Sequence, residues 1–129
     1  MPSPGVLFGA MTLGQLIDGL RRLPSEATVW VGSGRYRPTE LGSYRGYYED
    51  LALGFDARRD ELCTVSDLLV KCVGAVGKDF YGWKGGKYRA ALDTAVWAGN
   101  QGEANGMAVT GLSSIGERGY ILNVDLVDG

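Results

Sequence analysis

The feature that most constrains the fold of this chain is a helix-start signal that occurs twice. Thr12 is followed three residues later by Gln15, and Thr64 is followed three residues later by Asp67. In such a capping box the threonine side chain accepts the backbone N–H of the third helical residue, whose own side chain accepts the threonine N–H. The sequence therefore predicts two helices, each with a fixed start.

The apolar spacing after each signal predicts how far the helix runs. After the first, apolar residues recur at three- and four-residue spacing until Pro24, which predicts a helix to about Arg22 with a buried stripe formed by Leu13, Leu16, Ile17 and Leu20. The second helix is expected to run through Val73 or slightly beyond, because Gly74 and Gly77 weaken its end. The second helix contains Cys72 on its apolar stretch.

The rest of the chain is typical of short strands. Runs rich in β-branched and aromatic residues are separated by glycines, of which the chain has 21; they are "ATVWVG", "DLALGF", "DFYGW", "TAVWAG", "GMAVTGLSSI" and "GYILNVDLV". The later runs suggest an antiparallel meander with glycine turns of positive φ, as in "NQGEANG" and "SSIGERG". The polar stretch "GSGRYRPTELGS" is expected to be a connection. The predicted fold is α+β, with a mainly antiparallel sheet of about five to six short strands and two capped helices.

Length and composition set the domain organisation. A chain of 129 residues with 45% hydrophobic and 22% charged residues can bury one core but not two. We therefore expect a single domain over residues 11–129. Residues 1–10 are rich in proline and glycine and are expected to form a flexible arm before it.

Charge and apolar patterning exclude two classes of partner. The formal net charge of -2 does not favour binding to DNA or RNA, which requires an excess of basic side chains. No segment approaches the roughly 20 apolar residues of a membrane span, and the N-terminus lacks the pattern of a secretory signal. Cys63 and Cys72 are expected to be reduced thiols packed as small hydrophobes rather than a disulfide.

The chain lacks most of the residue types and groupings that enzymes use for catalysis. The chain has no histidine, which removes Ser-His and Cys-His nucleophilic systems and most zinc sites. The carboxylates are scattered, and adjacent ones on a strand face opposite ways, so they do not by themselves form a metal site. We expect no catalytic residues, no metal and no cofactor.

Aromatic and cationic residues gather in two stretches, "GSYRGYYEDLAL" and "DFYGWKGGKYRA". Aromatic rings stack on nucleobases, and arginine and lysine hold phosphate by charge-assisted hydrogen bonds. The first group is expected to lie beside Arg35, Tyr36 and Arg37 in one loop region. The predicted ligand-binding residues are Arg35, Arg37, Tyr44, Arg45, Tyr47, Trp83, Lys84, Gly85, Gly86, Lys87 and Tyr88.

Two other interpretations of these residues stay open. Strand alternation places Tyr44 opposite Arg45 and Tyr47, so some of the rings belong to the core, and Tyr48 and Tyr81 are expected to be structural. Alternatively, the whole cluster is a protein interface, where tyrosine, tryptophan and arginine are also enriched. A pocket between two copies of the chain would satisfy both interpretations, so a homo-oligomer is compatible with the sequence.

We call these two stretches the first and the second aromatic box. Their sequences resemble those of a family of small tailed-phage and prophage proteins without an assigned function, many of them from actinobacteria. The shared pattern is "SYRGYYEDLAL", the capped helix "TVSDLL" and "FYGWKGGKYRAALDTAVWAGNQG", and it covers about residues 11–100. The resemblance marks Ser43 to Tyr48 and Trp83 to Tyr88. This chain has Trp83 where family members carry tyrosine, and its C-terminal hairpin fits the pattern poorly. The resemblance implies a phage origin, and the lack of a signal pattern and of a membrane span leads us to expect the protein in the cytoplasm of its host cell.

Together these observations predict a non-catalytic protein that sequesters a small phosphorylated nucleotide in an aromatic and basic pocket. Candidate ligands are cyclic nucleotides and ADP-ribose derivatives, by analogy with viral sponge proteins that remove nucleotide immune signals and resemble this chain in size and in missing catalytic machinery. The first alternative is an inhibitor that binds a host macromolecule through the same surface. The second is a small phosphodiesterase or hydrolase that uses carboxylates.

Overall fold

The computed structural model describes residues 10–32, 36–44, 50–56, 62–82, 86–99 and 107–126. Within these ranges the chain forms two helices, α2 and α3, eight strands and one 3-10 turn. In chain order they are α2 (Leu13–Arg21), β1 (Val29–Val31), β2 (Arg37–Ser43), β3 (Leu51–Asp56), α3 (Val65–Ala75), β4 (Asp79–Gly82), β5 (Gly86–Arg89), β6 (Val96–Ala98), β7 (Met107–Ser114), η2 (Gly116–Arg118) and β8 (Tyr120–Leu126). The α+β class predicted from the sequence is confirmed.

Both predicted capping boxes are present. The Thr12 side chain accepts the Gln15 N–H at 3.1 Å, and the Gln15 side chain accepts the Thr12 N–H at 2.9 Å. Thr64 and Asp67 make the same reciprocal pair at the start of α3, at 3.1 and 3.0 Å. Local side-chain chemistry thus determines where both helices begin.

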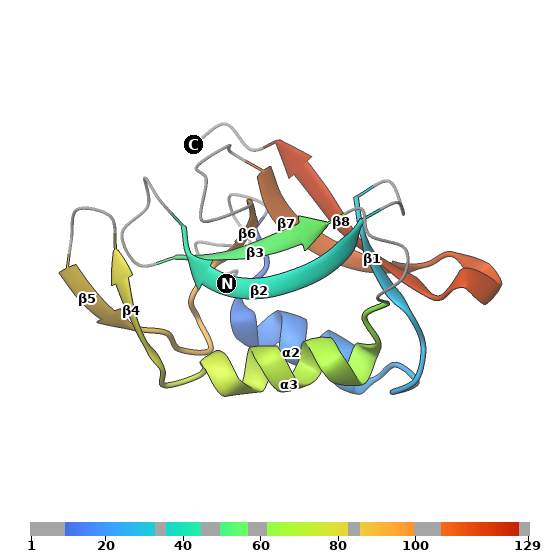
Figure 1. The fold of residues 1–129 in the computed structure, drawn as a ribbon, viewed down its shortest axis with the longest axis horizontal. Coiled ribbons are helices and arrows are strands. Elements are labelled where there is room, and N and C mark those ends of the chain that lie inside the picture. Colours follow the sequence, from blue (N-terminus) through green and yellow to red (C-terminus); the bar gives the residue numbers. More distant parts are fainter. Residues whose placement is uncertain are drawn as a thin grey trace, which may run out of the picture.

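Six strands form one sheet in the order β1-β8-β7-β6-β3-β2. The run β6-β7-β8 is the antiparallel meander expected from the sequence, whereas β1 pairs with β8, and β3 with β6, in parallel. The sheet is curled, so that its two outermost strands, β1 and β2, come together. At this point the Val31 N–H donates to the carbonyl of Tyr36, the residue before β2, at 2.7 Å. In Figure 1 the start of β2 lies beside the end of β1 at the right of the sheet.

The sequence-based prediction was wrong in two places. β2 lies within the stretch expected to be a polar connection, and β4 pairs with β5 in a separate two-stranded hairpin instead of joining the meander. Pro38 made β2 hard to predict, since proline has no backbone N–H to donate to a neighbouring strand and is therefore rare within strands. It is tolerated because the register of β2 against β3 is irregular between Pro38 and Leu41, and because the bridge found on the other side of β2 in the described ranges joins Tyr36, not Pro38, to Val31.

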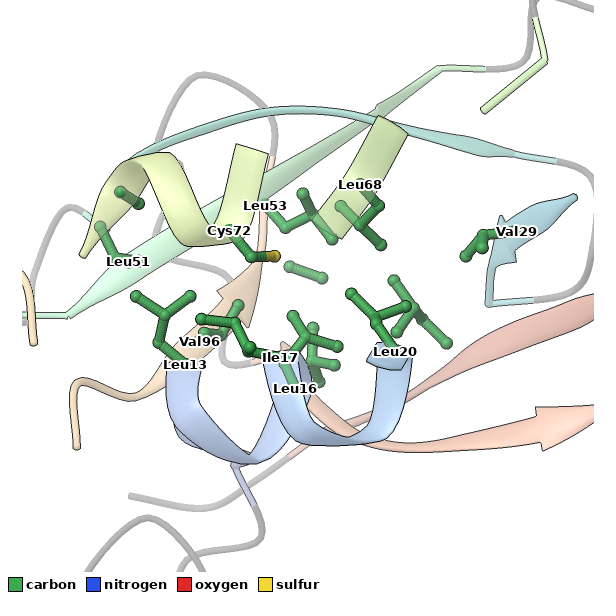
Figure 2. Packing of buried hydrophobic residues seen from close by; sticks show 14 of the residues in the cluster. Leu13, Leu16, Ile17, Leu20, Val29, Leu51, Leu53, Leu68, Cys72 and Val96 are labelled. Atoms are coloured by element: carbon green, nitrogen blue, oxygen red, sulfur yellow. The ribbon is translucent and has the colours of Figure 1, made fainter. Parts of the chain in front are cut away.

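The core lies between the sheet and the two helices, which run side by side along one face (Figure 1). The predicted stripe of α2, Leu13, Leu16, Ile17 and Leu20, is buried against the sheet and α3, as Figure 2 shows. Alternate residues of the strands point to the other face, where a second buried cluster contains Ala10, Tyr44, Ala52, Trp97 and Ala108. Ala10 therefore packs with the domain and is not part of a flexible arm, while residues 1–9 lie outside the described ranges.

Glycines fulfil the predicted turn role in the last hairpin. Gly116, the first residue of η2, and Gly119, directly after η2, have φ values of 72° and 116°. A Cβ on Gly119 would collide with the Thr28 carbonyl oxygen, to which the Tyr120 N–H donates at 2.9 Å. Only glycine therefore fits where this turn returns the chain to β1. The predicted turn "NQGEANG" lies outside the described residues.

Candidate ligand-binding site

The structure brings the described parts of the two aromatic boxes into contact. The Tyr88 hydroxyl, from the second box, hydrogen-bonds the Asp50 carbonyl at 2.7 Å and the Ser43 hydroxyl at 3.1 Å, both at the first box. The Tyr44 N–H donates to the same Asp50 carbonyl at 2.9 Å. The ends of the first box are thus tied to each other and to β5.

This contact is an interior one, which corrects two predicted ligand contacts. Tyr44 is fully buried, with its ring stacked on Trp97 at 4.8 Å between centroids and 6° between planes. The Trp97 indole N–H donates to the Asp50 carboxylate at 3.0 Å, and Tyr88 is 7% exposed. Alternation along β3 and β6 directs Ala52 and Trp97 to this face of the sheet, so Tyr44 packs on them instead of facing solvent.

In the β4–β5 hairpin, the predicted phosphate ligand Lys87 points away from Tyr88. Lys87 lies next to Tyr88 on a strand, so the two side chains point to opposite faces of the hairpin. The Lys87 ammonium is 3.8 Å from one Asp79 carboxylate oxygen, and the Arg89 Nε is 3.3 Å from the other. Gly86 opposes Gly82 in the hairpin register. Lys87 therefore shares a carboxylate with Arg89 and does not face the contact between the two boxes.

Arg37 lies at the other end of β2, so the expected single loop region does not exist. β2 has seven residues, which at about 3.3 Å per residue separates Arg37 from Ser43 by roughly 20 Å. Arg37 is half-buried and opposes Asp56 in the register with β3. The predicted set is thus divided between two ends of one strand.

The remaining predicted site residues lie outside the described ranges. They are Arg35, Arg45, Tyr47, Trp83, Lys84 and Gly85. Tyr48 and the side chain of Tyr81 lie outside them as well. The roles expected for these residues stay predictions.

A cleft in the described part of the chain lies at the Arg37 end of β2, and we call it the sheet-end cleft. It has a volume of about 580 Å³ and is lined by Val31, Gly32, Tyr36, Phe55, Met107, Thr110, Asn123, Val124 and Asp125. These residues come from the strands β1, β3, β7 and β8 and, for Gly32 and Tyr36, from the connection between β1 and β2. A smaller hollow of about 210 Å³ lies between α3, β2 and β4, where Lys71 is paired with Glu40 at 3.0 Å.

One wall of the sheet-end cleft is aromatic. Tyr36 is 38% exposed, and its ring meets the Phe55 ring edge to face at 5.4 Å between centroids. Val31, Met107 and Val124 add apolar surface that is continuous with the core. The cleft thus contains an accessible tyrosine ring, fixed by its contact with Phe55, next to apolar side chains.

The cleft is also lined by polar residues of β7 and β8. The Thr110 hydroxyl lies 2.8 Å from the Asp125 carboxylate and 3.3 Å from the Asn123 carbonyl. The Asn123 amide nitrogen donates to the Ser113 hydroxyl at 2.8 Å. The register of β7 shifts between Val109 and Gly111, which places Thr110 in the irregularity. No sequence motif predicted this polar group, because its members are ordinary strand residues that come together only when β7 pairs with β8.

The two cysteines are free and buried, as expected. Burial is the main cause that raises the pKa of Cys63 to about 11 and that of Cys72 to about 12. Both side chains are therefore neutral thiols near pH 7, and the thiolate is the nucleophilic form. Among the described residues, no three histidine, cysteine, aspartate or glutamate side chains gather closely enough to hold a metal ion.

No family model, curated protein or solved structure matches this chain. In the ranges that the structure describes, no helix is long and apolar enough to cross a membrane.

Proposed function

We propose that the protein binds a small phosphorylated nucleotide in the sheet-end cleft and holds it without turning it over. The observation that carries this proposal is the accessible Tyr36 ring, held edge to face on Phe55, in a cleft of about 580 Å³ that polar residues of β7 and β8 also line. Ligand pockets commonly have volumes of about 300–1,000 Å³, an apolar lining and a few placed polar groups. A nucleobase matches those requirements because it is flat and carries its polar atoms on its edge.

Tyr36 is the residue that we expect to contact the base. A base stacked on an aromatic side chain gains roughly 1–3 kcal/mol, and more than a third of the Tyr36 surface is accessible. The two predicted phosphate ligands nearest in sequence are Arg35 and Arg37. The proposed arrangement therefore keeps the predicted arginines of this region and replaces Tyr44 with Tyr36 as the stacking residue.

Retention without turnover is supported by the side chains available for chemistry. The chain has no histidine, and the raised pKa values of Cys63 and Cys72 keep both thiols neutral. The resemblance of the two boxes to phage proteins supports a phage-encoded sponge that removes a nucleotide immune signal in the host cytoplasm. A cyclic nucleotide or an ADP-ribose derivative is the ligand class that this role requires.

Calorimetric titration of the whole chain with a panel of cyclic nucleotides and ADP-ribose derivatives tests the proposal. At least one ligand is expected to bind with a Kd below about 10 µM, which corresponds to about -7 kcal/mol. Prolonged incubation with that ligand should return it unchanged. Failure of every ligand to bind at this level contradicts the proposal, and product formation would favour the hydrolase alternative.

Variants at the two ends of β2 locate the ligand. Tyr36→Ala should weaken binding at least tenfold, because it removes the stacking ring. Arg45→Ala and Lys84→Ala test the two boxes, and Leu92→Ala at an exposed leucine is the control that should bind like wild type. If Arg45→Ala and Lys84→Ala abolish binding and Tyr36→Ala does not, the ligand lies at the boxes and the cleft assignment is wrong.

A homo-oligomer is the second candidate, and a specific surface favours it. The outer face of α3 exposes Val70 and Val73, with Val76 just beyond the helix; Val70 is 68% exposed. Two copies of α3 packed antiparallel would bury these valines and place Asp67 of each copy near Lys78 of the other, which gives the self-complementary charge pattern of a two-fold interface. We therefore propose a second copy of this chain as the occupant of this face.

Sedimentation velocity tests the dimer independently of any ligand. Wild type should sediment as a dimer at about 100 µM, and Val70→Asp should sediment as a monomer because a charge cannot be buried unpaired at the centre of the interface. Leu92→Asp is the matched control, since Leu92 is also an exposed aliphatic residue, at 57%, but is not part of α3. A monomeric wild type, or a dimer that survives Val70→Asp, contradicts this assembly.

A further inference from the structure

The sheet-end cleft runs along one edge of β8. The register of β8 with β7 turns Val124 to the core face of the sheet and turns Asn123 and Asp125 to the opposite face. All three residues nevertheless line the same cleft, which Gly32 and Tyr36 also line. A cleft that touches both faces of a strand passes along its edge, and here that edge is turned toward the connection between β1 and β2.

This edge of β8 loses its neighbouring strand after Leu122. β1 pairs with residues 120–122 of β8, and the chain then turns at Gly32, whose φ is 66°. The Leu122 carbonyl accepts the Gly32 N–H at 3.0 Å, so the main-chain groups of Leu122 point toward β1. Because main-chain groups alternate in direction along a strand, the N–H and carbonyl of Val124 point the same way, past the end of β1. In the described ranges no hydrogen bond to either of these two groups is found.

The accessible tyrosine of the cleft stands across from this edge. Val31 pairs with Leu122 on one side and is bridged to Tyr36 on the other. Paired residues share a face, so the Tyr36 ring lies on the core face, where it contacts Phe55. Two strand spacings separate Tyr36 from β8, which is about 10 Å. A flat base stacked on Tyr36 therefore fits between that ring and the edge of β8.

We infer that the main chain of Val124 binds the pairing edge of the nucleobase, with its N–H as the donor and its carbonyl as the acceptor. This inference rests on the proposed function and specifies which groups of the cleft hold the base. An unpaired strand edge offers a donor and an acceptor to any complementary partner. A nucleobase is complementary because its pairing edge also carries a donor beside an acceptor; in adenine these are the N6 amine and the ring N1.

Amide hydrogen exchange, followed by nuclear magnetic resonance, tests the contact in the unmodified chain. In the free protein the Val124 N–H should exchange at least tenfold faster than the Leu122 N–H, which is paired with β1. Saturation with cyclic adenosine monophosphate or ADP-ribose, whichever binds more tightly, should slow exchange at Val124 at least tenfold. A Val124 N–H that is already protected in the free protein overturns the inference, as does exchange that the bound nucleotide leaves unchanged.

Two variants at one position isolate the N–H group. Val124→Pro removes the N–H, and proline is tolerated at a strand edge where that group faces no neighbouring strand. Val124→Ala keeps the N–H and also removes part of the valine side chain. In calorimetric titration with the same nucleotide, the proline variant should bind at least tenfold more weakly than the alanine variant. Equal affinities of the two variants overturn the inference.

A modified nucleotide tests the same contact from the side of the base. The 1,N6-etheno derivative keeps a flat base that can stack on Tyr36, but the added ring joins N1 to N6 and removes the pairing edge. It should bind wild type at least tenfold more weakly than the parent nucleotide, and equal binding contradicts the inference. This comparison replaces the one between the variants if the melting temperature shows that Val124→Pro does not fold.

The failure of this inference is distinguishable from failure of the proposed function. If an adenine nucleotide binds and Tyr36→Ala weakens it, but exchange at Val124 does not change, only the main-chain contact is wrong. If neither adenine nucleotide binds, the inference is overturned, and the proposed function depends on the rest of the panel. If no member of the panel binds, both fail.

Discussion

Removing the Tyr88 hydroxyl should destabilise the protein without changing its affinity for a nucleotide. In Tyr88→Phe the ring stays packed against Phe80, from which it is 6.0 Å between centroids, while the hydrogen bonds to the Asp50 carbonyl and the Ser43 hydroxyl are lost. This substitution separates two roles for Tyr88, a packing role in the interior and a role as a ligand contact.

The expected magnitude follows from what remains bonded in the variant. The Asp50 carbonyl keeps the Tyr44 N–H at 2.9 Å, and Ser43 is half-buried and can bond water. Neither group is therefore left unsatisfied, and the loss should be that of ordinary hydrogen bonds, about 1–1.5 kcal/mol in the free energy of unfolding. For a domain of this size that loss corresponds to a fall in Tm of roughly 4 °C.

Urea unfolding followed by tryptophan fluorescence measures this loss. Tyr120→Phe, at a half-buried tyrosine on β8, is the matched control and should cost less than 0.5 kcal/mol, within the range of changes away from special contacts. A Tyr88→Phe variant as stable as wild type would refute the stabilising role of the contact between the boxes. A variant of unchanged stability that loses the nucleotide would show that Tyr88 contacts the ligand.

Three further outcomes test other parts of the structure. Gly119→Ala should lower the free energy of unfolding by more than about 2 kcal/mol in urea titration, because it combines a positive φ with a collision against the Thr28 carbonyl; a loss below 1 kcal/mol contradicts the turn geometry. Cys63 and Cys72 should resist a thiol reagent at pH 8 until the protein unfolds, and because their pKa values are raised in the folded state, stability should fall as the pH rises from about 9 toward 11–12; rapid labelling of the native protein would contradict their burial. Thr64→Ala should cost about 1 kcal/mol through the lost helix cap, as measured by thermal unfolding, and a neutral result would show that the capping box adds nothing.

The helices were predictable because their signals are local. A capping box places its reciprocal hydrogen bonds within three residues, so the sequence alone located Thr12 and Thr64 as helix starts. The apolar spacing then identified the buried side of α2. In both cases neighbouring residues carry the whole signal.

The missed strand and the parallel pairings depend on distant partners. β2 contains Pro38, which is unfavourable within a strand, and it forms because β3 pairs along one side of it and Tyr36 bridges to Val31. The parallel contacts of β1 with β8 and of β3 with β6 join segments far apart in the chain. No residue within these strands indicates a particular partner.

The candidate site was predictable only in its chemistry. The aromatic and cationic residues of the boxes drew attention to Tyr44 and Tyr88, which turned out to be interior groups held by Asp50 and Trp97. The sheet-end cleft draws its lining from five separate elements, and each contributes only one to three unremarkable side chains. Long-range pairing creates such a site, so residue types alone could not locate it.

Nuclear magnetic resonance mapping of the bound nucleotide on the ¹⁵N-labelled protein tests the central claim most directly. The account predicts that backbone amide shifts concentrate at Gly32, Tyr36 and Val124, around the sheet-end cleft. The indole N–H of Trp97, which is bonded to Asp50 at the far end of β2, should hardly move. Shifts that concentrate on Trp97 and its surroundings, or no shifts with any nucleotide of the panel, would contradict it.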